Sequence, residues 1–132
     1  MANEIILDPT KFEAAKEKLK AENPLFAVGE AEIRGVRYKA FTGAPPNLVG
    51  VFFYGVQHGE KDFLLYEDER LSFVETWSRA CRLAKALAED LGDKKGDHVA
   101  IAKRSQPEWC IAFMAVVSLG AVVTPLNAWW KT

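Results

Sequence analysis

The pattern of apolar and polar residues is most informative in the last third of the chain. Residues 99–102 and 121–124 are short, partly β-branched apolar runs, and the longer stretch between them, 107–119, is apolar on nearly every side. The short runs predict strands and the longer one a helix. Strand, helix and strand in so short a span predict a βαβ unit with parallel strands and a right-handed crossover. Such a helix suits a parallel sheet that is covered by helices on both faces.

Short polar signals predict where the helices begin and end. Ser105 to Glu108 and Ser72 to Glu75 each have the spacing of a capping box, and Gly92 and Gly120 provide stops. The helix after Ser72 has its apolar residues on one side, which predicts an amphipathic helix lying on a sheet face. That predicted stripe consists of Val74, Trp77, Cys81, Ala84, Ala88 and Leu91, with Ala80 and Leu87 beside it.

Four further elements are predicted upstream. Asp8 and Pro9 begin a helix that ends before Pro24, and residues 30–41 alternate around Arg34-Gly35 as a hairpin does. Asn47 caps a helix from Leu48 to about His58. Residues 62–66 and 71–73 are separated by a charged turn, which predicts a second hairpin.

These elements predict an α/β fold with a partial helix-layered sheet and a βαβ unit. We divide the chain into residues 1–61, with the N-terminal helix, the short extended pair and the capped helix, and residues 62–132. The second part holds the hairpin, the amphipathic helix and the βαβ unit.

A membrane span is the main alternative for the apolar region. Trp109 to Leu126 covers 18 mostly apolar residues, the lower end of what a bilayer requires. Gly120 and Pro125 interrupt it, and the change to β-branched residues halfway along favours helix and strand. We therefore expect no transmembrane segment. An acidic N-terminus without an apolar core also predicts no signal peptide and a cytoplasmic protein.

Composition and motifs exclude several kinds of chemistry. The net charge of −1 gives no indication of nucleic acid as a partner. Cys81 and Cys110 lack metal or CxxC spacing and are expected to be small buried hydrophobic residues rather than a disulfide. No phosphate-loop, dinucleotide, zinc-protease or serine-hydrolase motif occurs. A lone His58 favours helix capping over catalysis.

An anion site is conceivable where the helix after Ser105 follows a strand. Pro107 removes one N–H donor there, and Glu108 adds a negative charge, so phosphate binding is disfavoured. The sequence therefore predicts no catalytic, cofactor-binding or metal-ligating residue in this chain.

Several spaced blocks nevertheless resemble the start of the adenylate-forming acyl-CoA synthetase superfamily, which includes acyl- and aryl-CoA ligases, luciferases and adenylation domains. The matching blocks are residues 63–66, 70–75, 95–101, 107–108 and 120–127. Residues 34–36 and 44–48 are similar to the fatty-acid-CoA ligase branch. The resemblance implies the first part of the large N-terminal domain of that fold.

For the parent enzyme, the resemblance implies ATP, magnesium and CoA as cofactors and a carboxylic acid as substrate. The family's phosphate loop ending in Pro-Lys-Gly, its adenine segment, its ribose-binding Asp and its C-terminal Lys have no counterpart here. We therefore expect an N-terminal quarter of a synthetase, inactive alone, with no cofactor bound and no family catalytic residue assigned. Truncation, a cloned fragment and a split gene stay open, as do the acyl substrate and membrane contact of the parent.

The residues themselves also allow a self-contained α/β module that binds a small ligand at the carboxyl ends of its strands, or an interaction domain. An exposed sheet edge or apolar face is expected to drive self-association. Trp129 and Trp130 follow the last strand, where packing is favoured over ligand contact.

Overall fold

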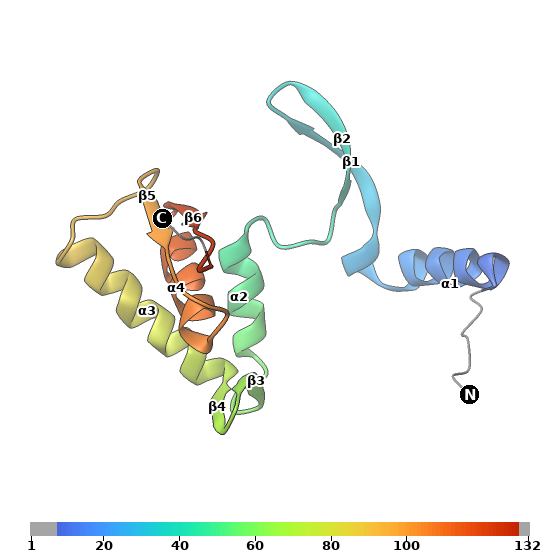
Figure 1. The fold of residues 1–132 in the computed structure, drawn as a ribbon. Coiled ribbons are helices and arrows are strands. Elements are labelled where there is room, and N and C mark those ends of the chain that lie inside the picture. The colour runs from blue at the N-terminus through green and yellow to red at the C-terminus, as the bar shows by residue number, and fades with distance from the viewer. Residues whose placement is uncertain (1–7, 130–132) are drawn as a thin grey trace. The chain divides into compact units, whose positions relative to one another are not determined.

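The chain folds into two compact units that divide between Pro45 and Pro46. The computed structural model describes residues 8–129 (Figure 1). From sequence we placed a boundary after residue 61, but residues 46–61 belong to the second unit. The helix within them, α2 (Leu48–Val56), contacts both long helices of that unit.

The first unit is a helix followed by a hairpin. It contains α1 (Pro9–Glu22), the short 3₁₀ helix η1 (Pro24–Phe26), β1 (Val28–Ile33) and β2 (Val36–Phe41). The Asp8 side chain accepts a hydrogen bond from the backbone N–H of Thr10 at 2.9 Å, as expected of an N-cap. The predicted start of this helix and its end before Pro24 are both confirmed.

The hairpin turn is the one that the Arg34-Gly35 pair predicts. The strands β1 and β2 are antiparallel, with Ile33 opposite Val36, so only Arg34 and Gly35 form the loop. Both residues have positive φ, 54° and 79°, which is the geometry of a two-residue type I′ turn. Glycine adopts this conformation at little cost, and the right-handed twist of the strands requires it.

The second unit contains the remaining elements. They are α2, β3 (Asp62–Tyr66), β4 (Glu69–Ser72), α3 (Phe73–Glu89), β5 (His98–Ile101), α4 (Pro107–Ser118) and β6 (Val122–Pro125). The strands β3 and β4 form the predicted antiparallel hairpin. In Figure 1, α3 and α4 run side by side and α2 lies beside α4, and contacts among all three helices agree with this view.

The βαβ unit is confirmed. The strands β5 and β6 pair in parallel, from His98 opposite Val122 to Ile101 opposite Pro125, and α4 connects them. Every residue of α4 from Trp109 to Ser118 is buried or half-buried, as its apolar composition predicts. Gly120 ends the helix with a φ of +72°.

The membrane alternative is not supported by this geometry. The apolar window from Trp109 to Leu126 is divided between a 12-residue helix and a strand rather than forming one long span. Within residues 8–129, no helix has the length and apolarity that crossing a bilayer requires.

The hydrophobic core lies where α3 and α4 meet the β3–β4 hairpin. Its centre consists of Leu71, Ala80, Ile111 and Met114. Half-buried apolar side chains surround this cluster: Phe52, Leu64, Trp77 and Leu83. The core therefore joins α2, the hairpin, α3 and α4 into one packed unit.

The buried face of α3 agrees only in part with the predicted stripe. Ala84 of the stripe and Ala80 beside it are buried, but so is Thr76, whereas Val74 and Cys81 are exposed. We expected α3 to lie on a sheet face, but it packs chiefly against α4. A helix–helix contact places small residues at the line of closest approach. Hydropathy alone overlooks such a line when one member is polar, as Thr76 is.

Only one of the two predicted capping boxes forms its cap. The Ser72 Oγ accepts a hydrogen bond from the backbone N–H of Glu75 at 3.1 Å. At the start of α4 the N-cap residue is Gln106, without a side-chain bond, so the prediction that Ser105 caps this helix is wrong. Because Pro107 is the first residue of α4, one of the donors that a cap would satisfy is missing anyway.

Substituting Ser72 and Ser105 in turn tests whether only Ser72 caps its helix. We expect Ser72→Ala to lower the free energy of unfolding of the second unit by about 1–2 kcal/mol, because the cap and a half-buried hydrogen bond are lost. Ser105→Ala is the matched control and is expected to change it by less than about 0.5 kcal/mol. Urea denaturation followed by tryptophan fluorescence measures both, since all four tryptophans lie after residue 46. Equal losses in the two variants would contradict the assignment.

Candidate functional site

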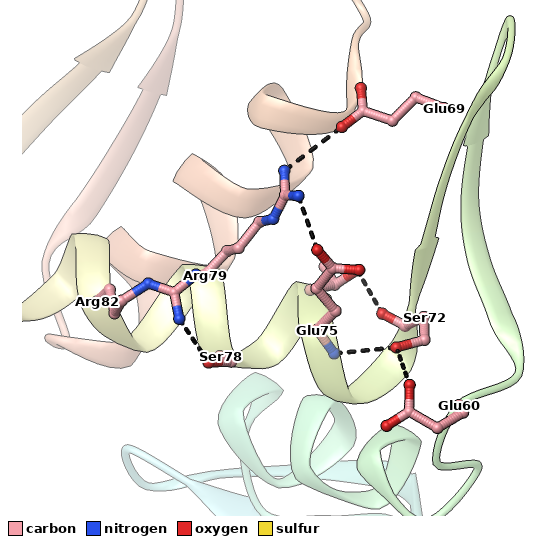
Figure 2. A network of polar contacts seen from close by, with 8 residues as sticks. Glu60, Glu69, Ser72, Glu75, Ser78, Arg79 and Arg82 are labelled. Atoms are coloured by element: carbon pink, nitrogen blue, oxygen red, sulfur yellow. Dashed lines mark hydrogen bonds and ion pairs between the residues drawn. The ribbon is translucent and has the colours of Figure 1, made fainter.

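A cluster of polar contacts in the second unit lies where β4 is followed by α3 (Figure 2). Ser72 is at its centre. Besides capping α3, its hydroxyl donates to the Glu60 carboxylate at 3.0 Å, and its carbonyl accepts from the Thr76 hydroxyl at 2.7 Å. Thr76 has no solvent exposure, so this bond satisfies a buried hydroxyl that would otherwise be costly.

Arg79 on α3 also connects this helix to β4 (Figure 2). Its guanidinium donates to the Glu75 carboxylate at 2.7 Å and to Glu69 on β4 at 3.4 Å. The hydrogen bond to Glu75 is the main cause of a raised pKa for Arg79, with the charges of Glu75 and Glu69 adding to it. Because these carboxylates are paired with a cation that joins the hairpin to the helix, the contacts favour a structural role for the cluster.

A groove of about 320 Å³ lies between β3 and the start of α4. None of its lining residues is charged: Leu64, Leu65, Tyr66, Ser105, Gln106, Pro107, Trp109 and Cys110. The Gln106 amide donates to the Tyr66 hydroxyl at 3.4 Å across the groove. These residues provide no charge that would hold a phosphate.

The carboxyl ends of β5 and β6 form the edge at which α/β folds commonly bind ligands. There the Arg104 guanidinium lies 4.4 Å from the ring centroid of Trp129, a cation–π contact. The backbone N–H of Trp129 donates to Asn127 Oδ1 at 2.9 Å, and Lys103 pairs with Glu108 at 3.6 Å. Trp129 is largely exposed and contacts a cation rather than packing into the sheet, and Trp130 lies outside the described residues.

The remaining candidates do not form a reactive centre. His58 follows the end of α2, and its ring lies 4.9 Å from that of Phe73. Within residues 8–129, no three His, Cys, Asp or Glu side chains are grouped so that they could hold a metal ion. That no residue of the chain acts as catalyst or ligand stays a prediction.

Two of these contacts were missed in the sequence analysis. Glu75 and Arg79 are four residues apart on one helix, a spacing that indicates an ion pair and could have revealed it. Arg104 and Trp129 are brought together only by the parallel pairing of β5 and β6, so no local pattern indicates their contact.

The two cysteines are free, and they differ in exposure. We expected both to be buried, but Cys81 is exposed because the buried line of α3 passes through Ala80 and Ala84 instead. Cys110 is half-buried, and this burial raises the pKa of its thiol by disfavouring the thiolate.

This difference predicts selective alkylation. Because the thiolate is the reactive form, a raised pKa and partial burial both slow the reaction of Cys110. Near neutral pH, iodoacetamide is expected to modify Cys81 several times faster, as followed by mass spectrometry of peptides. The variants Cys81→Ser and Cys110→Ser isolate each rate, and a faster reaction in Cys81→Ser than in Cys110→Ser would contradict the expectation.

Comparison with known proteins places these elements in a family. Residues 54–132, more than half of the chain, match the family of AMP-binding enzymes. An acetyl-coenzyme A synthetase of Rhizobium meliloti is 37% identical over an alignment of 71 residues, and the match covers 49% of this chain and 11% of the relative. Long-chain fatty acid transport protein 2 of Rattus norvegicus is 33% identical over 67 residues, 51% of this chain and 11% of the relative.

A solved structure agrees with both relatives. The Klebsiella oxytoca NpsA N-terminal subdomain, in complex with 3-hydroxybenzoyl-AMSN, superposes with a TM-score of 0.61 at 26% identity. The match covers 64% of this chain and 22% of the NpsA chain. The fold of this chain thus matches part of the NpsA N-terminal subdomain.

The chain therefore belongs to the family of AMP-binding enzymes. Its resemblance to the start of an adenylate-forming CoA ligase is confirmed by these relatives. The chain spans about a tenth of the length of the curated relatives that it matches.

Proposed function

We propose that this chain supplies the first structural layer of an ATP-dependent carboxylate–CoA ligase and is inactive alone. The observation that carries the proposal is the family match over residues 54–132, which spans the hairpin, both long helices and the βαβ unit. The matched segment is about a tenth of the relatives' length, so most of such an enzyme lies outside it.

The activity that we propose for the complete enzyme has two steps. A carboxylate attacks the α-phosphate of ATP, which releases pyrophosphate and gives an acyl-adenylate. The CoA thiol then attacks the acyl carbon, and AMP leaves. Magnesium is proposed as the ion that neutralises the phosphates. Relatives named for acetyl-coenzyme A and for long-chain fatty acids support an aliphatic carboxylic acid as substrate and fatty-acid metabolism as the context. The cytoplasm is the proposed compartment.

The residues described here do not fit ATP, magnesium or CoA. Within residues 8–129 no acidic group is arranged for a metal, and the groove beside α4 has no cationic lining residue. Pro107 and Glu108 occupy the start of α4, where an anion would need free N–H groups and no negative charge. No step of the reaction is therefore assigned to this chain, and its proposed role is to position other parts of the enzyme.

Two measurements test the proposal. The 132-residue chain, given ATP, magnesium and acetate, hexanoate or palmitate, is expected to show no carboxylate-dependent ATP–pyrophosphate exchange. The genomic sequence after codon 132 is expected to encode a Ser/Thr/Gly-rich loop ending in Pro-Lys-Gly, in the same or a neighbouring frame. The product that includes this loop is expected to exchange pyrophosphate with at least one of these acids.

Either of two results would overturn the proposal. One is saturable exchange by the 132-residue chain itself, which would require a site that we have not identified. The other is the absence of any adjoining frame with the phosphate loop, which would favour a self-contained α/β module.

A further inference from the structure

The helix α2 borders an apolar groove of about 320 Å³ on the second unit. Residues from α2, β3, α3 and α4 form it together with His58, and none of them is Lys, Arg, Asp or Glu. The lining residues are Val51, Phe52, Tyr54, Gly55, His58, Phe63, Phe73 and Met114. Phe63 and Phe73, which both line it, stack with ring centroids 4.4 Å apart. The groove is therefore apolar.

An apolar ridge runs directly beside this groove. Leu48, Val51 and Tyr54 are three residues apart along α2, so they lie on neighbouring turns of one face. About half of each side chain is exposed. Phe52 and Val56, on the other side of the helix, are half-buried against the unit. We call Leu48, Val51 and Tyr54 the α2 ridge; two of its members also line the groove.

The charge pattern around the ridge restricts what can cover it. From residue 40 to residue 59 the sequence has no Lys, Arg, Asp or Glu. Charged residues begin only at Glu60, Lys61 and Asp62, beside the far part of the groove, so the helix that carries the ridge offers no complementary group to a charged peptide or an anionic lipid surface. A second copy of this chain could bind the ridge without any charged group. Two-fold symmetry brings identical residues close together, and an uncharged surface avoids the like-charge repulsion that this would otherwise cause.

We propose that the α2 ridge is the contact through which two copies of this chain associate. The arrangement is isologous, so the ridge of each copy enters the groove of the other. Val51 and Tyr54 stand at the border between ridge and groove and would be the central contacts. The proposal goes beyond the proposed function, and its failure would leave the family membership and the pyrophosphate-exchange tests unaffected.

The exposed area predicts a weak dimer. An aromatic side chain presents on the order of 200 Å² when fully exposed, so the half-exposed ridge and groove offer about 400 Å² per copy. The total of about 800 Å² is below the standard interface of about 1,600 Å², which favours dissociation constants in the micromolar range or weaker. Association should therefore depend strongly on protein concentration.

Sedimentation velocity of the 132-residue chain from about 5 µM to about 300 µM tests this proposal. The weight-average mass of the unaltered chain is expected to rise toward twice 14.7 kDa. Val51→Glu and Tyr54→Glu place like charges at the contact and are expected to remain monomeric throughout. Tryptophan fluorescence and circular dichroism verify that both variants are folded, which is expected because both positions are half exposed.

Phe53→Glu is the matched control. Phe53 lies on the same helix and is 62% exposed, but it does not line the groove and points about 100° away from Tyr54. This variant is expected to dimerise as the unaltered chain does. The proposal is overturned if the unaltered chain is monomeric at the highest concentration, or if Phe53→Glu alone abolishes the dimer. Binding of the monomer to phosphatidylcholine vesicles that Val51→Glu eliminates would also overturn it, in favour of a lipid surface.

Discussion

Replacing Leu71 with alanine is expected to lower the free energy of unfolding of the second unit by about 2–5 kcal/mol. Leu71 is 2% exposed and belongs to the central cluster with Ala80, Ile111 and Met114. Its truncation removes apolar contacts and leaves a cavity, which both helices would have to move to fill. Since small domains are stable by only about 5–15 kcal/mol, a large part of the total stability would be lost.

Leu65→Ala on the same hairpin is the control for this prediction. Leu65 is 58% exposed, so the same change of side chain is expected to cost less than about 0.5 kcal/mol. Urea denaturation followed by tryptophan fluorescence compares the two. If Leu65→Ala were as destabilising as Leu71→Ala, the hairpin would present its other face to the core.

Enlarging Ala80 is expected to have the second largest effect. Ala80 is fully buried on the face of α3 that packs against α4. Leucine at this position would force the helices apart or drive neighbouring side chains from their preferred rotamers, at a cost of about 1–3 kcal/mol. Thermal unfolding by circular dichroism measures the loss, and the expected fall in Tm is about 4–15 °C for a unit of this size.

Cys81→Leu adds a leucine one residue further along the same helix. Because Cys81 is exposed, this variant is expected to keep the Tm of the unaltered chain within about 3 °C. A Tm unchanged by Ala80→Leu and lowered by Cys81→Leu would show that the stripe expected from hydropathy, rather than the observed one, faces α4.

The elements of this chain could be predicted from local sequence to a large degree. Proline at the first helical position, glycine after the last, and the alternation around Arg34-Gly35 each act over a few residues, and each element they predicted is present. The βαβ unit was predictable for the same reason. A helix that is apolar all round can be accommodated only if the surroundings cover every side, as they do for α4.

The packing of the elements against one another could not be predicted from local sequence. Whether α3 packs on a sheet or on a helix depends on neighbours distant in sequence, and this choice decides that Thr76 is buried and Cys81 exposed. The failed cap at Ser105 also depends on its surroundings. Ser72 ends β4 and directly precedes α3, whereas Ser105 lies beyond the end of β5 and the helix after it begins at Pro107.

The candidate site also combines features that local sequence predicts with features that depend on tertiary packing. Family membership is carried by several spaced blocks of residues and could be recognised from sequence. The contact between Arg104 and Trp129 depends on strand pairing and could not. The apolar groove beside α2 likewise requires side chains from four elements, whose meeting no local pattern specifies.

The junction at Ser72 has a consequence for how this region folds. β4 ends at Ser72 and α3 begins at Phe73, so hairpin and helix share a boundary without any connecting loop. Zipping of the hairpin positions the serine that starts the helix, and the first helical turn in turn holds the last strand pair in register. Because these contacts are close in sequence, the entropy of loop closure is small and formation is fast. Residues 62–89 are thus suited to order first, while the parallel pairing of β5 and β6 waits for the 20 residues between them.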